Sequence, residues 1–157
     1  MYRELISVAI LATFLQLGNT YSFRNCIEAA NSNHTIFKCA NHQKDSVKDI
    51  VDDVLLSATN VTINFCTLSH IPSGSFSHLP KLEVLTLNHN YVGTISKDAF
   101  VNLTYLQTLN LSSNNISYFS PYLFRGLHNL TELFLADDRL TYLSQDFFTD
   151  LINLNTL

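Results

Sequence analysis

The chain repeats itself every 24 residues, and this period limits its fold more than any other feature. With Leu82 at the first position of a repeat, Leu106, Leu130 and Leu154 stand at the same position further on. The complete repeats cover residues 58–81, 82–105, 106–129 and 130–153, and residues 154–157 open a fifth. A repeat this short cannot bury its own apolar side chains. The repeats must therefore stack on one another as a solenoid.

The apolar pattern inside each repeat predicts how the coils are built. Positions 1, 4, 6, 11, 14, 19 and 22 are apolar in all four complete repeats. Positions 4 and 6 of the LxxLxL start lie on one side of a short strand, because side chains alternate along strands. We expect these strands to stack in parallel as the concave sheet of a right-handed arc. Position 19 is a phenylalanine column that fills the wider convex side, where the chain is irregular or briefly helical; its members are Phe76, Phe100, Phe124 and Phe148.

Position 9 is expected to form a hydrogen-bonded ladder between the coils. It is occupied by Cys66, Asn90, Asn114 and Asp138. An asparagine amide there can both accept from and donate to the backbone of adjacent turns. It would satisfy peptide groups that the short strands leave unpaired.

The N-terminus has the pattern of a secretory signal peptide at residues 1–22. Its apolar run from Leu5 to Leu17 has 13 residues, shorter than the roughly 20 that a membrane-spanning helix needs. The alternatives are a buried N-terminal element and an uncleaved anchor. Secretion would place the rest of the chain in an oxidising compartment.

Residues 23–57 are expected to cover the first repeat as an N-terminal cap. Cys26 and Cys39 lie within this segment, and we predict that they pair, closing a loop worth about 3 kcal/mol. Cys66 is then a buried thiol of the ladder, with a reactive or intermolecular thiol as the alternative. Between residues 43 and 57 a capping-box motif from Ser46 to Asp49 competes with the need to enter the first strand. We interpret this stretch as mostly extended.

Charge and motifs exclude several functions. The chain has 9 Lys+Arg and 13 Asp+Glu, a net charge of −4, which argues against binding nucleic acid mainly by neutralising phosphates. HExxH, CxxC, GxSxG and glycine-rich phosphate loops are absent from the sequence, so we expect no enzyme activity, no metal and no cofactor.

The solvent side of the predicted sheet is the candidate ligand-binding face. It is polar, has no Lys or Arg, and carries Phe65, His89 and Phe134 as possible ligand contacts. The alternative is an ordinary solvated surface. The set is Asn60, Thr62, Asn64, Phe65, Val84, Thr86, Asn88, His89, Thr108, Asn110, Ser112, Ser113, Glu132, Phe134, Ala136 and Asp137.

Two further sets of residues carry hypotheses about modification and pH. Asn-x-Ser/Thr motifs predict N-glycosylation at Asn33, Asn60, Asn102, Asn110, Asn115 and Asn129. A glycan on Asn110 would stand in the middle of the concave sheet. The histidines could act as an acid sensor, although they are scattered in sequence; they are His34, His42, His70, His78, His89 and His128.

The pattern LxxLxLxxNxLxxLxxxxFxxL resembles the leucine-rich repeats of extracellular proteins. A signal peptide, a cap with two cysteines and these repeats together resemble the start of a vertebrate Toll-like receptor ectodomain. Asp138 at the ladder and Ala58 at the first position depart from the pattern. The resemblance implies an innate immune receptor on the extracellular or endosomal-lumen side of a membrane. Such a receptor binds a microbial ligand (nucleic acid, lipid or protein) or a protein partner, and signals as a dimer.

The sequence breaks off inside the fifth repeat, which suggests a fragment whose membrane span and signalling parts would lie beyond Leu157. The alternatives are a secreted matrix or adhesion protein with the same repeats, and a short soluble decoy.

Overall fold

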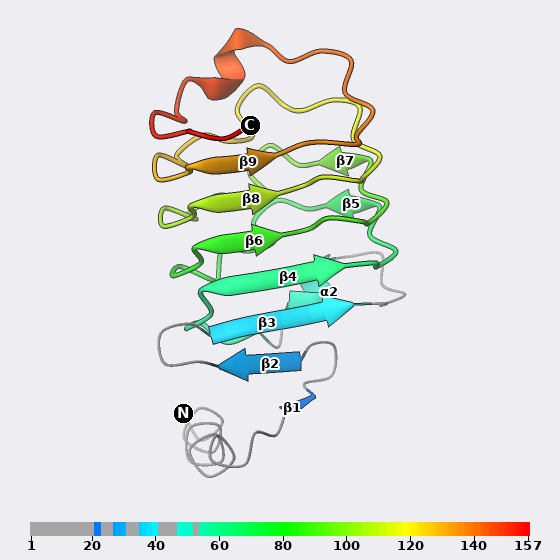
Figure 1. The fold of residues 1–157 in the computed structure, drawn as a ribbon, viewed down its shortest axis with the longest axis vertical. Coiled ribbons are helices and arrows are strands. Elements are labelled where there is room, and N and C mark those ends of the chain that lie inside the picture. The colour runs from blue at the N-terminus through cyan, green and yellow to red at the C-terminus, as the bar shows by residue number, and fades with distance from the viewer. Residues whose placement is uncertain (1–20, 23–26, 31–34, 41–46, 52–53) are drawn as a thin grey trace.

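The protein is a stack of coils with one long sheet running along a single side (Figure 1). The computed structural model describes residues 21–22, 27–30, 35–40, 47–51 and 54–157. Each complete repeat contributes one strand to this sheet, and all four run parallel. They are β4 (Asn60–Asn64), β6 (Val84–Thr86), β8 (Thr108–Asn110) and β9 (Glu132–Phe134). The predicted leucine-rich repeat solenoid with a concave parallel sheet is confirmed.

The strand register is set by the 24-residue period. Leu85 pairs with Val61 on one side and Leu109 on the other, and Leu109 pairs with Leu133. All four side chains are fully buried. In the fourth coil Leu135 is only half-buried, because residues after 153 add an isolated bridge rather than a full strand. The leucine side chains are therefore fully buried from solvent only where one coil packs on the next.

The far side of the coils is irregular, as predicted. It holds a two-stranded sheet of β5 (His70–Ile71) and β7 (Thr94–Ile95), and the 3-10 helix η1 (Gln145–Phe148). The rings of Phe76 and Phe100 stack with centroids 6.1 Å apart.

The predicted phenylalanine column is wrong at its last member. Phe147, not Phe148, is buried in the fourth coil, and its ring lies against those of Phe119 and Phe124 at 6.0 and 6.4 Å. Phe148 is half-buried. The tighter winding of η1, with three residues per turn, turns Phe147 inward in its place.

The cap lengthens the sheet at its N-terminal end. The cap strands are β1 (Tyr21–Ser22), β2 (Ile27–Ala30) and β3 (Thr35–Ala40). β2 pairs antiparallel with both β1 and β3, and β3 pairs in parallel with β4. Cys39 is buried and disulfide-bonded. Its predicted partner Cys26 lies outside the described residues, as do residues 1–20 of the predicted signal peptide.

The interpretation of residues 43–57 as mostly extended is wrong for α2 (Val47–Val51), a short helix. Val47, Ile50, Val51 and Val54 are buried at helical spacing, so burial of this apolar face beneath the first coil decides the local structure. Ser46 of the capping-box motif lies outside the described residues. Across the ranges that the structure describes, no helix is long and apolar enough to cross a membrane.

We predict that Leu109→Ala lowers the free energy of unfolding by about 2–5 kcal/mol, because it leaves a cavity between β6 and β9. Urea denaturation followed by circular dichroism measures this loss. Val101→Ala, at a side chain 39% exposed on the convex side, is the control and should change stability by about 0.5 kcal/mol or less. Equal effects of the two substitutions would contradict the stacked-leucine core.

Candidate ligand-binding face

The concave face is organised in rows that cross the strands. One row runs Lys38, Thr62, Thr86, Asn110 and Phe134 from the cap to the last repeat. The repeat pattern does not predict Lys38 on this face, because Lys38 lies in the cap, although the alternation in residues 35–40 signals that its side chain points to solvent. Phe37 and Cys39 are buried, whereas Lys38 and Ala40 are exposed. The concave face of the sheet thus extends into the cap.

A second column follows the ends of the strands, where each chain segment turns away from the sheet. Phe65, His89, Ser113 and Asp137 occupy it, all with φ between 53° and 58°. This left-handed region is tolerated by Asp and His but is unusual for a bulky side chain such as Phe. Recurrence in every coil makes the conformation a property of the solenoid. This backbone conformation does not require a phenylalanine at position 65, since His89, Ser113 and Asp137 adopt it as well.

Phe65 and His89 form an exposed pair of stacked rings. Their centroids lie 5.1 Å apart and their planes differ by 2°. Phe65 is 58% exposed, and the two coils are joined here by the Phe65 N–H, which donates to the His89 carbonyl at 2.9 Å. Two of the predicted contact residues thus lie together in the structure. Their flat surface can take a planar group by stacking.

Phe134 is not part of this pair. It lies on β9, with β6 and β8 between it and β4, and its ring is half-buried. Its register partner is Asn110. Within the described residues no other aromatic ring contacts Phe134.

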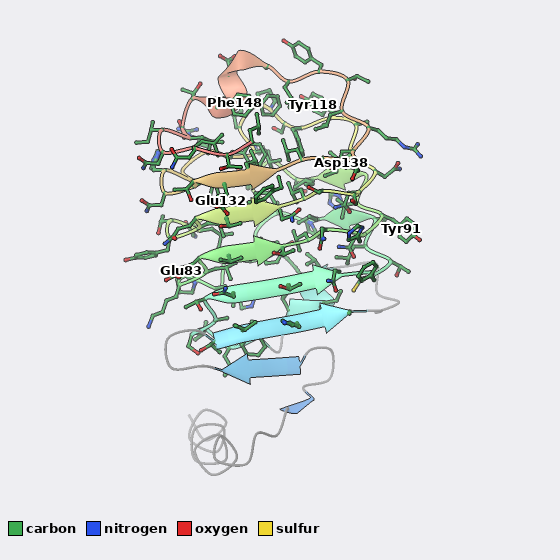
Figure 2. All side chains as sticks on the ribbon, in the orientation of Figure 1. Glu83, Tyr91, Tyr118, Glu132, Asp138 and Phe148 are labelled. Carbon is green, nitrogen blue, oxygen red and sulfur yellow. The ribbon has the colours of Figure 1, made fainter. Side chains whose placement is uncertain are left out.

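Charge changes sign along the face. Lys38 is the only Lys or Arg among the described residues on this sheet, and it lies at the cap end. The far end is acidic. Glu132 accepts from the Thr108 hydroxyl at 3.0 Å, and Asp137 accepts from the Ser113 hydroxyl of the preceding coil at 3.5 Å. In Figure 2 Glu83 lies at the edge where the strands begin, and Tyr91 and Asp138 lie at the edge where they end.

The predicted ladder forms at the asparagine positions. Asn90 Oδ1 accepts from the Cys66 N–H at 2.8 Å, and its Nδ2 donates to the carbonyls of Ile63 and Leu87. Asn114 repeats the arrangement one coil later, with Nδ2 donating to Leu87 and Leu111. The buried Cys66 thiol donates to the carbonyl of Asn64 at 3.3 Å.

Asp138 completes only half of this arrangement. Its Oδ1 accepts from the Ile116 N–H at 3.0 Å, as an asparagine would. Its Oδ2 is buried and has no hydrogen-bond partner. Desolvation raises the pKa of Asp138 above its ordinary value, against two backbone hydrogen bonds that lower it.

The acceptor asparagines fall on several faces. Asn102, Asn115 and Asn129 are exposed, and Asn60 and Asn110 are half-buried on the concave strands. Asn33 lies outside the described residues. Every described acceptor thus reaches the surface.

The four described histidines lie in different places. His70 contacts Thr94 on the far sheet, His78 contacts the Val51 carbonyl, and His128 contacts the Asp150 carbonyl. His89 is on the concave edge, and His34 and His42 lie outside the described residues. The structure does not bring the described histidines into one cluster.

Among the described residues, neither a metal-ligand cluster nor a surface hollow forms a catalytic or metal-binding site. Where the chain is described, no group of three or more His, Cys, Asp or Glu could hold a metal ion. A hollow of about 400 Å³ between the third and fourth coils lies beside Arg125 and Asp150 on the convex side. The Gly126 N–H donates to Asp150 across this seam at 2.9 Å, so the hollow is a crevice between stacked coils.

Similarity to known proteins agrees with the solenoid fold. The family model for the leucine rich repeat matches residues 57–116 and 85–140, more than half of the chain. The chain therefore belongs to the leucine-rich repeat family, whose members are typically binding domains rather than enzymes. A search of curated proteins finds no match.

Many solved structures share the fold, with 247 matching chains. One of them is a chain in the crystal structure of a TLR13–ssRNA13 complex, a Toll-like receptor with single-stranded RNA. It is 28% identical with a TM-score of 0.77 over 85% of this chain. The match spans 19% of the length of that receptor chain.

We predict that Asp138→Asn stabilises the protein at neutral pH by about 1 kcal/mol, because an amide supplies the donor that the ladder lacks. In the unmodified protein the raised pKa of Asp138 favours folding at low pH. This contribution is present below the unfolded-state pKa, about 3.9, and is lost as pH rises through the folded-state pKa.

Urea denaturation at pH values from about 3.5 to about 7, a range that spans the ordinary Asp pKa of about 3.9, measures both effects. The substitution should remove the contribution of Asp138 to the pH dependence of the free energy of unfolding. Asp98→Asn, at an exposed position, is the matched control. An unchanged pH profile in Asp138→Asn would show that the ladder carboxyl does not titrate with folding.

Proposed function

We propose that this chain is the ligand-recognition part of a Toll-like innate immune receptor. The observation that carries the proposal is the 28% identity and 0.77 TM-score to a Toll-like receptor over 85% of the chain. In this proposal the concave arc binds the ligand, and signalling passes through a receptor dimer and a membrane span outside this chain.

The proposed ligand is a single-stranded nucleic acid that presents unpaired bases. Exposed bases stack on aromatic rings, and this stacking tolerates different sequences because every base has a flat face. The Phe65–His89 pair offers such a surface at the open edge of the sheet. Lys38 places the positive charge of the face at the same, cap-proximal end, away from Glu132 and Asp137.

The backbone at Phe65 supports a binding role for its ring. A phenylalanine with φ of 54° and 58% exposure is favoured neither by its backbone conformation nor by burial. Backbone strain of this kind is retained most often where a side chain serves binding or catalysis.

The proposed location is the extracellular or endosomal side of a membrane, reached through the secretory pathway. The apolar run from Leu5 to Leu17 and the disulfide-bonded Cys39 support this location. Structural disulfides persist in oxidising compartments and are rare in the cytosol.

We predict that Phe65→Gly weakens binding of a synthetic single-stranded RNA oligonucleotide while leaving the fold intact. Loss of one stacked base costs about 1–3 kcal/mol, or roughly 5- to 150-fold in Kd. Glycine adopts the left-handed backbone of this position readily, so the free energy of unfolding should stay within about 1 kcal/mol. Fluorescence anisotropy with labelled RNA measures Kd at fixed salt.

Tyr142→Ala removes a ring that is 68% exposed off the concave sheet and should leave Kd unchanged. Equal Kd values for Phe65→Gly and the unsubstituted chain would remove the ring pair from the binding site. Absence of RNA binding by the unsubstituted chain would remove nucleic acid as the ligand.

We also predict that Lys38→Ala reduces RNA affinity and lowers the slope of log Kd against log salt by about one phosphate contact. Anisotropy titrations at several salt concentrations measure the slope. Lys97→Ala, at an exposed convex position, serves as the charge-matched control. A slope that changes equally in both variants would indicate only a general effect of net charge.

A further inference from the structure

We infer that Asn110 carries an N-linked glycan whose first sugar packs on the ring of Phe134. The glycan would cover the part of the concave face over β8 and β9 and leave the Phe65–His89 edge open. The inference rests on passage through the secretory pathway, which is part of the proposed function.

The acceptor is held in a suitable orientation. Asn110, Leu111 and Ser112 form the acceptor motif, and Asn110 lies on β8 with its side chain on the concave face. The Ser112 N–H donates to Asn110 Oδ1 at 2.9 Å, which fixes the amide plane. Nδ2, on the other side of Cγ, makes no hydrogen bond to any described residue, and the side chain is half-exposed to solvent.

An aromatic side chain occupies the neighbouring position on the adjacent strand. Asn110 and Phe134 are register partners on adjacent parallel strands, whose spacing is about 4.8 Å. Their side chains therefore project side by side from the same face. An aromatic ring has a negative face, which suits the polarised C–H groups on the apolar side of a sugar ring.

The ring of Phe134 makes no contact with another aromatic ring of the described residues. It is half-buried, and it lies at the acidic end of the face near Glu132. That end is unfavourable for a polyanion. A neutral sugar carries no such penalty, so the sugar is the better match for this ring.

The modification is a group transfer that balances without a redox change. The donor is an oligosaccharide linked to a lipid diphosphate, acting through a transferase of the secretory pathway. The bond between the anomeric carbon and the diphosphate oxygen breaks, and a bond from that carbon to Nδ2 forms. The lipid diphosphate leaves, and the amide gives up one proton.

The first test is glycopeptide mass spectrometry of the full chain secreted from mammalian cells with its own N-terminus. We expect a glycan on Asn110 in the unsubstituted chain and in Ser112→Thr, which keeps the motif, and none in Ser112→Ala. Ser112→Ala retains the backbone N–H that holds Asn110. An unmodified Asn110 beside modified Asn102, Asn115 or Asn129 would overturn the inference alone. Absence of glycans at every acceptor would overturn it together with the proposed secretory location.

The second test asks whether the sugar contacts Phe134. Ser112→Ala should lower the thermal midpoint by about 2–4 °C when Phe134 is present, and by less than half as much in the Phe134→Ala background. Thr62→Ala, which removes the acceptor at Asn60 beside Val84, is the control and should act equally in both backgrounds. Equal effects of Ser112→Ala in the two backgrounds would overturn the contact with Phe134.

Discussion

The structure depends on contact between successive coils. Leu85, Leu109 and Leu133 are dry because each is covered by the equivalent side chain one repeat away. A coil of 24 residues has too little interior to bury them alone, so hydrophobic burial and strand pairing arise together when coils stack. Where stacking is partial, as beyond the fourth coil, Leu135 is only half-buried.

The same stacking decides which residues are neighbours on the surface. Because each position falls beside its counterpart 24 residues away, the concave face consists of rows in which one residue from each coil lies next to another. The row that begins with Lys38 ends with Phe134, and the column after the strands holds Phe65 and His89 as a ring pair. A binding surface of this kind is specified by a few positions in each repeat. An exposed ring such as that of Phe65 can be placed in the column after the strands without disturbing the core.

The ladder shows how polar satisfaction limits this freedom. Asn90 and Asn114 each use both ends of the amide, whereas Asp138 meets the acceptor half of the role and leaves Oδ2 buried without a partner. A carboxylate and an amide have the same shape, so this exchange keeps the geometry and changes the energetics. Asp138 is the carboxyl among the described ladder residues, and its raised pKa links the junction of the fourth coil to protonation.

The sequence by itself determined the period, the inward leucines, the ladder positions and the irregular convex side, since all follow from a 24-residue pattern and strand alternation. It also marked Phe65 and His89 as exposed. Only the tertiary structure decided what depends on contacts outside the pattern. The apolar face of residues 47–54 became the helix α2 because it packs beneath the first coil. Phe147 replaced Phe148 because η1 winds more tightly. Lys38 joined the concave face because β3 pairs with β4. Periodicity fixes which residues repeat, but contacts between non-repeating segments are settled only when the whole chain packs.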